Sequence, residues 1–217
     1  MPSYGTKLET ISIDGIPLNI VSLADRNQFD DPEKEAEKLG ISDSMWPISG
    51  LVWPSGLVLA RVISRLNLAN MSVLEVGCGI GIASLIAAYN DVNITASDYH
   101  PIVKNLLFRN AKENNIGDIK YIHGDWHYPI SNHGKFDLII GSDLLYDTHH
   151  AEILSVYINC HLSIHGRVIL IDPQRRRTGK IKKAMEALGF QYETTNLDIE
   201  GKEEQKGFFI QHTFLKG

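Results

Sequence analysis

The chain has 217 residues, of which 43% are apolar and 22% charged, and its formal net charge is -5. That length suits one domain with a full buried core, and the balance of residue types is ordinary for a globular protein. The negative charge argues against a broad nucleic-acid-binding face, and two cysteines outside any metal-ligand spacing argue against a disulfide scaffold.

The first ten residues, MPSYGTKLET, lack the basic and apolar segments of a signal peptide. We find no apolar stretch that approaches the roughly 20 residues of a membrane-spanning helix. The nine histidines show no HExxH or similar spacing, so no metal site is expected. We therefore expect a cytoplasmic protein of one domain without membrane contact, and the sequence leaves its oligomeric state open.

Residues 1–52 predict an N-terminal hairpin and cap that precede a core domain at 53–217. Two apolar runs, 8–13 and 16–23, flank Asp14-Gly15, a dipeptide that favours the positive φ angles of a tight hairpin turn. The charged stretch that follows is typical of a solvent-exposed helix or loop.

A segment with two Trp-Pro pairs, 45–56, precedes a helical pattern at 57–66. Its Trp46 either packs in the core or covers an acceptor pocket. Short apolar runs then alternate with helical patterns, which predicts a mostly parallel sheet with helices on both faces. The predicted strands are 73–76, 93–96, 119–123, 136–141 and 167–171, and the predicted helices are 80–89, 101–114, 148–162 and 180–188. Two final strands, 190–197 and 208–214, have no helix between them and indicate an antiparallel hairpin at the sheet edge.

A glycine-rich loop follows the first core strand, with Gly77, Gly79 and Gly81 in alternate positions. Glycines let a backbone turn sharply and approach a ligand, and the helix that follows begins with unpaired N–H groups. A dinucleotide fingerprint would require Gly or Ala where Ile82 stands. Glu75, just ahead of the loop, could receive an ammonium group directly or through water, and it would repel a pyrophosphate. The loop therefore favours a nucleotide-like cofactor other than a dinucleotide.

Acidic and aromatic side chains follow the next three strands. Asp98 could accept both hydroxyls of a ribose, or it could cap the helix that begins near residue 101. Asp125 could accept from an adenine amino group while Trp126 covers the ring. Ser142 and Asp143 follow the fourth strand. Because open α/β sheets bind ligands beyond the carboxyl ends of their strands, we expect these residues to form one site.

Together these motifs resemble class I S-adenosyl-L-methionine-dependent methyltransferases, which have a Rossmann-like seven-stranded sheet. The resemblance is closer to the methyltransferase-like protein-lysine methyltransferases and the bacterial nicotinamide-N-methyltransferase-like proteins. Trp53-Pro54-Ser55-Gly56 matches the tryptophan segment of that branch, and Asp143 with Tyr146 matches its Asp-x-x-Tyr or Phe motif. The resemblance runs from about residue 53 to 173 and more loosely to the C-terminus. It implies cofactor contacts at Trp53, Gly77, Gly79, Asp98, Trp126 and Ser142.

The same resemblance implies that Asp143 and Tyr146 face the methyl acceptor. The leading hypothesis is N-methylation of a protein lysine, with Asp143 orienting the amine and Tyr146 forming an aromatic wall. A nicotinamide-like small molecule is the rival acceptor, because the sequence after strand five, Asp172-Pro173-Gln174-Arg175, looks like the bacterial branch.

Two alternative functions do not involve methyl transfer. A non-catalytic module could bind S-adenosyl-L-methionine and act through a partner, and an NAD-dependent oxidoreductase is disfavoured by the glycine spacing and by Glu75. Residues 143–146 could also be a helix cap with packing side chains. The basic run 175–177 is either a solvated helix start or a surface for an acidic or phosphate-bearing acceptor.

Overall fold

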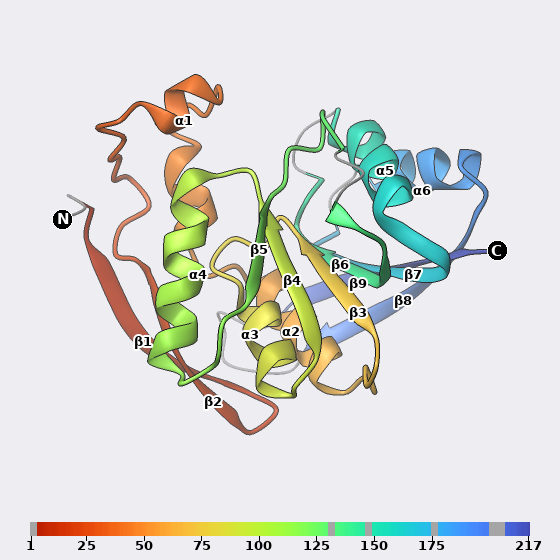
Figure 1. Cartoon of the computed structure of the whole chain (residues 1–217), viewed down its shortest axis with the longest axis horizontal. Helices are drawn as coiled ribbons and strands as arrows, with labels where there is room; N and C mark the ends of the chain where they lie inside the picture. Colours follow the sequence, from red (N-terminus) through yellow and green to blue (C-terminus); the bar gives the residue numbers. More distant parts are fainter. Residues whose placement is uncertain (1–3, 130–132, 146–148, 175–177, 200–206) are drawn as a thin grey trace.

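A computed structural model describes residues 4–129, 133–145, 149–174, 178–199 and 207–217. Two sheets organise these residues (Figure 1). The first is an antiparallel hairpin of β1 (Thr6–Ile13) and β2 (Ile16–Leu23). Its turn contains Asp14 and Gly15, whose φ angles are 48° and 89°. The hairpin predicted from the sequence is therefore confirmed.

The second sheet has seven strands in the order β5-β4-β3-β6-β7-β9-β8. Neighbours from β5 to β7 are parallel, and β9 runs antiparallel to both β7 and β8. The strands are β3 (Ser72–Val76), β4 (Asn93–Asp98), β5 (Lys120–His123), β6 (Phe136–Ser142), β7 (Leu162–Asp172), β8 (Phe190–Ile199) and β9 (Gly207–Lys216). This confirms the predicted α/β class, a Rossmann-like, mostly parallel sheet that ends in an antiparallel hairpin.

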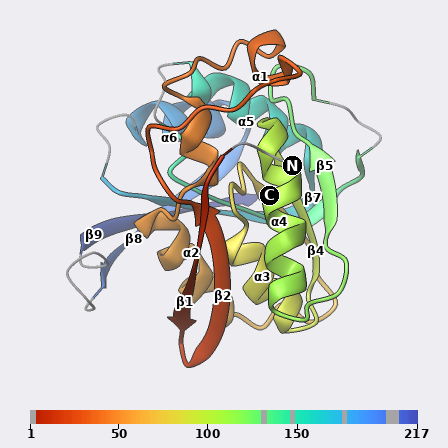
Figure 2. The same cartoon turned by 90° about the vertical axis from the view of Figure 1, so that its left-hand side faces the viewer.

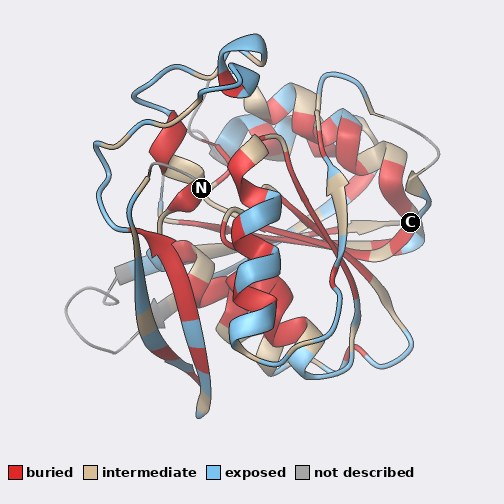
Figure 3. Ribbon diagram, turned by 60° about the vertical axis from the view of Figure 1, so that its left-hand side comes forward, coloured by how far each residue is buried: buried red, intermediate tan, exposed pale blue. Residues whose placement is uncertain are grey.

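Helices cover both faces of this sheet, and Figure 3 shows that their buried sides turn toward it. They are α1 (Glu35–Lys38), the 3-10 helix η1 (Trp46–Gly50), α2 (Pro54–Ser64), α3 (Ile82–Tyr89), α4 (Pro101–Glu113), α5 (His150–His161) and α6 (Thr178–Ala187). Buried residues of α2, α3 and α4 belong to one apolar cluster, and those of α5 and α6 to another. In α4 the buried residues recur every three or four positions, which gives the helix one apolar side.

The N-terminal hairpin is attached to the core through two asparagines of α4. Asn110 is fully buried; its Oδ1 accepts from the Val21 N–H at 2.7 Å, and its Nδ2 donates to the Val21 carbonyl at 3.1 Å. Asn114 repeats the pattern on Asn19, at 2.7 and 2.8 Å. These amides take the place of a neighbouring strand, because they satisfy backbone groups on the open edge of β2. The hairpin is thus a fixed part of the domain.

A cap that contains α1 and η1 lies at the end of the molecule toward which β4 runs, near the open end of the hairpin (Figures 1 and 2). Trp46 holds it. The Trp46 side chain is 2% exposed, and its ring centroid lies 5.6 Å from Tyr4, 6.0 Å from Phe29 and 5.8 Å from His100. Burial lowers the pKa of His100 to about 4, so that ring is neutral near pH 7. Of the two roles open to Trp46, the structure supports core packing.

The expectation that no apolar stretch approaches the length of a membrane-spanning helix was wrong. By length and composition alone, the 19 residues Trp46–Ser64 could cross a membrane. They form η1 and α2, and 44% of the most apolar 18 residues among them are buried inside the fold. Leu57, Leu59 and Ile63 pack in the main apolar cluster, which accounts for the apolar composition of α2.

Candidate cofactor and acceptor site

The glycine loop joins β3 to α3 in a conformation that requires glycine. Gly77, Gly79 and Gly81 have φ angles of 62°, 52° and 77°. A Cβ on Gly77 would lie 2.5 Å from Leu144 and 3.6 Å from the Trp126 ring. The loop therefore lies directly beneath the residues that follow β6, and the indole predicted to cover an adenine stands beside it.

Asp98 ties this loop to the end of β4. Its Oδ2 accepts from the Gly79 N–H at 2.9 Å, and its Oδ1 accepts from the His100 N–H at 2.9 Å. The helix cap is instead His100, whose Nδ1 accepts from the Ile102 N–H at 3.2 Å. Burial raises the pKa of Asp98, although these backbone bonds oppose the rise. A carboxylate has about four acceptor sites, so two backbone donors leave Asp98 able to accept ribose hydroxyls.

Glu75 has a partner that the sequence did not predict. Its Oε2 accepts from the Ser84 N–H at 2.9 Å and from the Ser84 hydroxyl, in the first turn of α3. The side chain therefore closes the helix N-terminus, where Gly81 offers no side chain for capping. Burial raises the pKa of Glu75 to about 7. Its contact with a cofactor ammonium group stays a prediction.

Asp125 and Trp126 follow β5 and are half-buried. The Asp125 Oδ1 accepts from the His127 N–H at 2.9 Å. The Trp126 ring meets His150 edge to face at 5.4 Å, and the His150 Nδ1 lies 2.9 Å from the Leu144 carbonyl oxygen. The first residue of α5 thus supports both the predicted adenine cover and the segment after β6. Because the sequence offered no pattern for His150, only the fold identifies it.

Ser142 is the last residue of β6, and Asp143 follows it. The Ser142 Oγ would lie 3.8 Å from a Cβ on Gly56, so the first turn of α2 abuts this point. Asp143 has a φ of 54°, and its N–H donates to the Ile171 carbonyl at 2.9 Å, which fixes the turn against β7. Buried Asp172 follows Ile171. Tyr146, predicted as part of an aromatic wall, lies outside the described residues, as do residues 175–177.

The cap closes against the glycine loop. Trp53 Nε1 donates to the Ile48 carbonyl at 2.8 Å, which joins the predicted tryptophan segment to η1. The next carbonyl oxygen, of Ser49, lies 3.2 Å from where a Cβ on Gly79 would stand. The structure therefore brings Trp53, the glycine loop, Asp98, Trp126 and Ser142 to one edge of the sheet. The role of Ser49 and its segment could not be read from the sequence.

The residues at this edge of the sheet suit the predicted cofactor. Gly77 and Gly79 are partly exposed and have no side chain, so a ligand can reach the loop backbone there, whereas Gly81 is buried against Leu107. One acid, one indole and one hydroxyl stand around it, at Asp98, Trp126 and Ser142. Among the described residues, no three His, Cys, Asp or Glu side chains are grouped so that they could hold a metal ion.

A family model described as lysine methyltransferase matches residues 33–188. A relative from Dictyostelium discoideum, named histidine protein methyltransferase 1 homolog, is 30% identical over 148 residues, which is 64% of this chain and 48% of the relative. The electron transfer flavoprotein beta subunit lysine methyltransferase of Rattus norvegicus is 30% identical over 139 residues, 60% of this chain and 54% of the relative. The chain thus matches about half the length of these relatives.

A solved structure shows the same fold. Magnesium protoporphyrin IX methyltransferase from Synechocystis, with bound S-adenosylmethionine, superposes with a TM-score of 0.61 at 19% identity. The match covers 76% of this chain and 80% of that protein.

Proposed function

The chain belongs to the lysine methyltransferase family, and from that premise we propose that it transfers a methyl group from S-adenosyl-L-methionine to a nitrogen, in particular a protein lysine side chain. One observation carries the proposal: the ends of β3, β4 and β6 bring the glycine loop, Asp98 and Asp143 to one edge, with Trp126 beside the loop. The relatives named for lysine and histidine methylation support a protein acceptor. A cytoplasmic location is part of the same proposal, and cell fractionation tests it.

The residues that would hold the cofactor have separate tasks. The backbone of Gly77 and Gly79 accommodates the ligand, Asp98 accepts from the ribose, and Asp125 with Trp126 takes the adenine. Trp53 and Ser142 complete the wall on the side of α2. When bound, the cofactor supplies an electrophilic methyl group on a positively charged sulfur. The loop, braced by Asp98 and covered by the cap, holds the reacting groups in line and away from water.

The acceptor lies on the side of Asp143. A lysine amine, with a reference pKa of about 10.4, is mostly protonated when it arrives. Before its lone pair can attack the methyl group, the amine must release that proton to solvent, and the positive charge of a bound cofactor would favour this loss. The Asp143 carboxylate favours the ammonium form instead, so its task is to bind and orient the amine rather than to remove its proton. Asp143 is half-exposed and its backbone is fixed on Ile171, which gives the carboxylate a defined position at the edge of the site.

A change of Asp143→Asn separates the two acceptor classes. A neutral amide cannot form an ion pair with an ammonium group, so transfer to lysine peptides should fall about tenfold in kcat/KM, whereas a neutral nicotinamide-like ring needs no acid. The matched control is Asp118→Asn, at an exposed position before β5. Tritium transfer from labelled S-adenosyl-L-methionine to lysine peptides and to nicotinamide provides the measurement. Loss of nicotinamide transfer with lysine transfer intact would contradict the proposal.

A further inference from the structure

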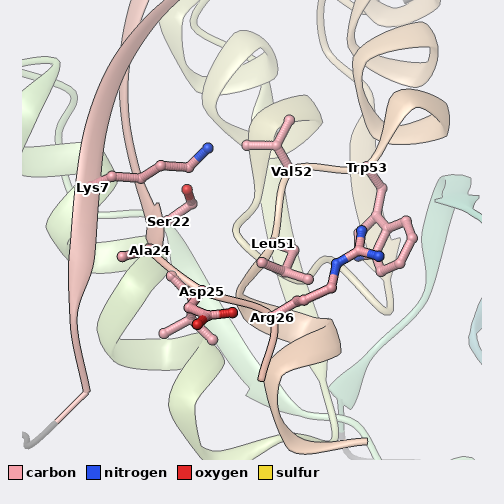
Figure 4. Close-up of a pocket in the computed structure, with 9 residues that line it drawn as sticks. Lys7, Ser22, Ala24, Asp25, Arg26, Leu51, Val52 and Trp53 are labelled. Atoms are coloured by element: carbon pink, nitrogen blue, oxygen red, sulfur yellow. The ribbon is translucent and has the colours of Figure 1, made fainter. Parts of the chain in front are cut away.

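A cleft of about 350 Å³ lies beside this edge, between the open end of the hairpin and the segment that leads into α2 (Figure 4). Lys7, Ser22 and Arg26 line it from the hairpin side, and Leu51, Val52 and Trp53 line it from the other. A cofactor role for Trp53 is already predicted, but the hairpin residues have no part in that site. The cleft is therefore a concave surface next to the reaction site and separate from it.

The hairpin side of the cleft offers hydrogen-bond donors. The Ser22 hydroxyl is buried, and among the described residues it has no hydrogen-bond partner. Arg26 is exposed and makes no ion pair or hydrogen bond within the described part of the chain. The Lys7 ammonium lies 3.3 Å from the Glu9 carboxylate, but both side chains are substantially exposed, so this pair is weak and easily exchanged. These three hydrogen-bond donors can therefore interact with an acceptor group on another molecule.

The charge of the cleft indicates which kind of hydrogen-bond acceptor it would bind. The chain as a whole carries a net charge of -5, yet the cleft has two cations and one acid among its lining residues. The acid is Asp25, whose Oδ1 accepts from the Asn27 N–H at 2.9 Å. Arginine and lysine beside a free hydroxyl complement a carboxylate, which accepts through both oxygens. The lining residues thus carry an excess of one positive charge, and Arg26 is the cation that would distinguish an acidic ligand from a neutral one.

We propose that this cleft binds an aspartate or glutamate side chain of the acceptor protein, close in sequence to the methylated lysine. The inference rests on the proposed function, because it assigns the specificity of that reaction. Trp53 is the N-cap of α2, and Gly56, about one helical turn further on, abuts Ser142 beside Asp143. An extended peptide advances about 3.3 Å per residue. Because Trp53 also lines the cleft, a residue a few positions from a lysine at Asp143 can reach it.

Synthetic peptides test the proposal. Each has one central lysine, and the three positions on either side carry either acidic residues or their amides, Asn and Gln. Initial rates of tritium transfer from labelled S-adenosyl-L-methionine give kcat/KM for every peptide. We expect the best acidic peptide to exceed its amide counterpart by roughly tenfold, as for one charge-assisted contact. The preference should shrink as salt is raised, since exposed charges are screened.

Two variants connect the preference to the cleft. Arg26→Gln should reduce it to about twofold or less, whereas Lys104→Gln, which removes an exposed charge from α4, should leave it unchanged. Ser22→Ala should weaken the preference without lowering the melting temperature, because it deletes a buried hydroxyl that has no partner in the described structure. That combination separates a binding role from a folding role.

The outcomes are distinct. Equal rates on acidic and amide peptides, or a preference that survives in Arg26→Gln, would overturn the cleft assignment while leaving lysine methylation intact. If no lysine peptide of either kind is methylated, the proposed function itself fails, and the inference that rests on it fails as well. Transfer that favours acidic peptides in the wild type and loses this preference in Arg26→Gln would establish the cleft as the specificity site.

Discussion

Replacing Glu75 by Gln should stabilise the protein at alkaline pH. The Glu75 carboxyl is 3% exposed, and burial raises its pKa from the ordinary 4.5 to about 7. Because the folded state prefers the neutral acid, its favourable contribution is complete below about pH 4.5 and is lost as the pH rises through about 7. A rise of that size corresponds to roughly 3 kcal/mol. Glutamine resembles the neutral acid in shape, and its carbonyl can still accept from Ser84.

The assay is urea unfolding of both proteins at several pH values between 5 and 8.5. Near pH 5 the two free energies of unfolding should agree within about 1 kcal/mol, and at pH 8.5 the Glu75→Gln protein should be more stable by up to about 3 kcal/mol. Exposed Glu113, changed to Gln, serves as the control and should leave the pH profile unaltered. A Glu75→Gln protein that is less stable than the wild type at pH 8.5 would show the opposite, namely that the folded state favours the ionised carboxylate.

Three further predictions concern residues that shape and support the candidate site. Gly77→Ala should cost about 1–3 kcal/mol of stability through its positive φ and its clash with Leu144, as measured by thermal unfolding, and Leu144→Ala should recover part of the loss. Asn110→Ala should lower the free energy of unfolding by about 2 kcal/mol or more in urea unfolding, since it leaves buried backbone groups of Val21 unpaired. The same change should weaken S-adenosylhomocysteine binding, because Asn110 Nδ2 donates to the carbonyl of Ile80 in the glycine loop at 3.2 Å. Asp98→Asn should weaken the same ligand by at least tenfold in calorimetry, because an amide nitrogen cannot accept from ribose hydroxyls.

The sheet and its helices were predictable because each core segment carries its own signal. Apolar runs such as 136–141 and the apolar periodicity of α4 depend on neighbouring residues only. Glycine spacing and acids after strand ends likewise pointed to the edge where we place the cofactor. These local patterns locate Gly77, Gly79 and Asp98, which the structure joins through the bond from the Gly79 N–H to Asp98.

Contacts between segments far apart in the chain were not predictable. Nothing around Asn110 indicates that it would complete β2, 89 residues earlier, because an asparagine in a helix is equally suited to solvent. Ser84 gave no sign that it would hold Glu75, and Ser49 gave none that its carbonyl would lie over the glycine loop. Such contacts depend on how the sheet and the cap bring distant backbones together. The cleft between the hairpin and Trp53 likewise forms between segments far apart in the chain, so the sequence alone did not predict it.

Calorimetric titration of the purified protein with S-adenosylhomocysteine, with NADH as the control ligand, measures directly whether this edge binds the methyl donor's product. We expect micromolar binding of S-adenosylhomocysteine and no heat from NADH, because the glycine spacing and the acids at this edge suit the first ligand and not the second. Binding of NADH without S-adenosylhomocysteine would contradict the assignment of this edge as a methyl-donor site.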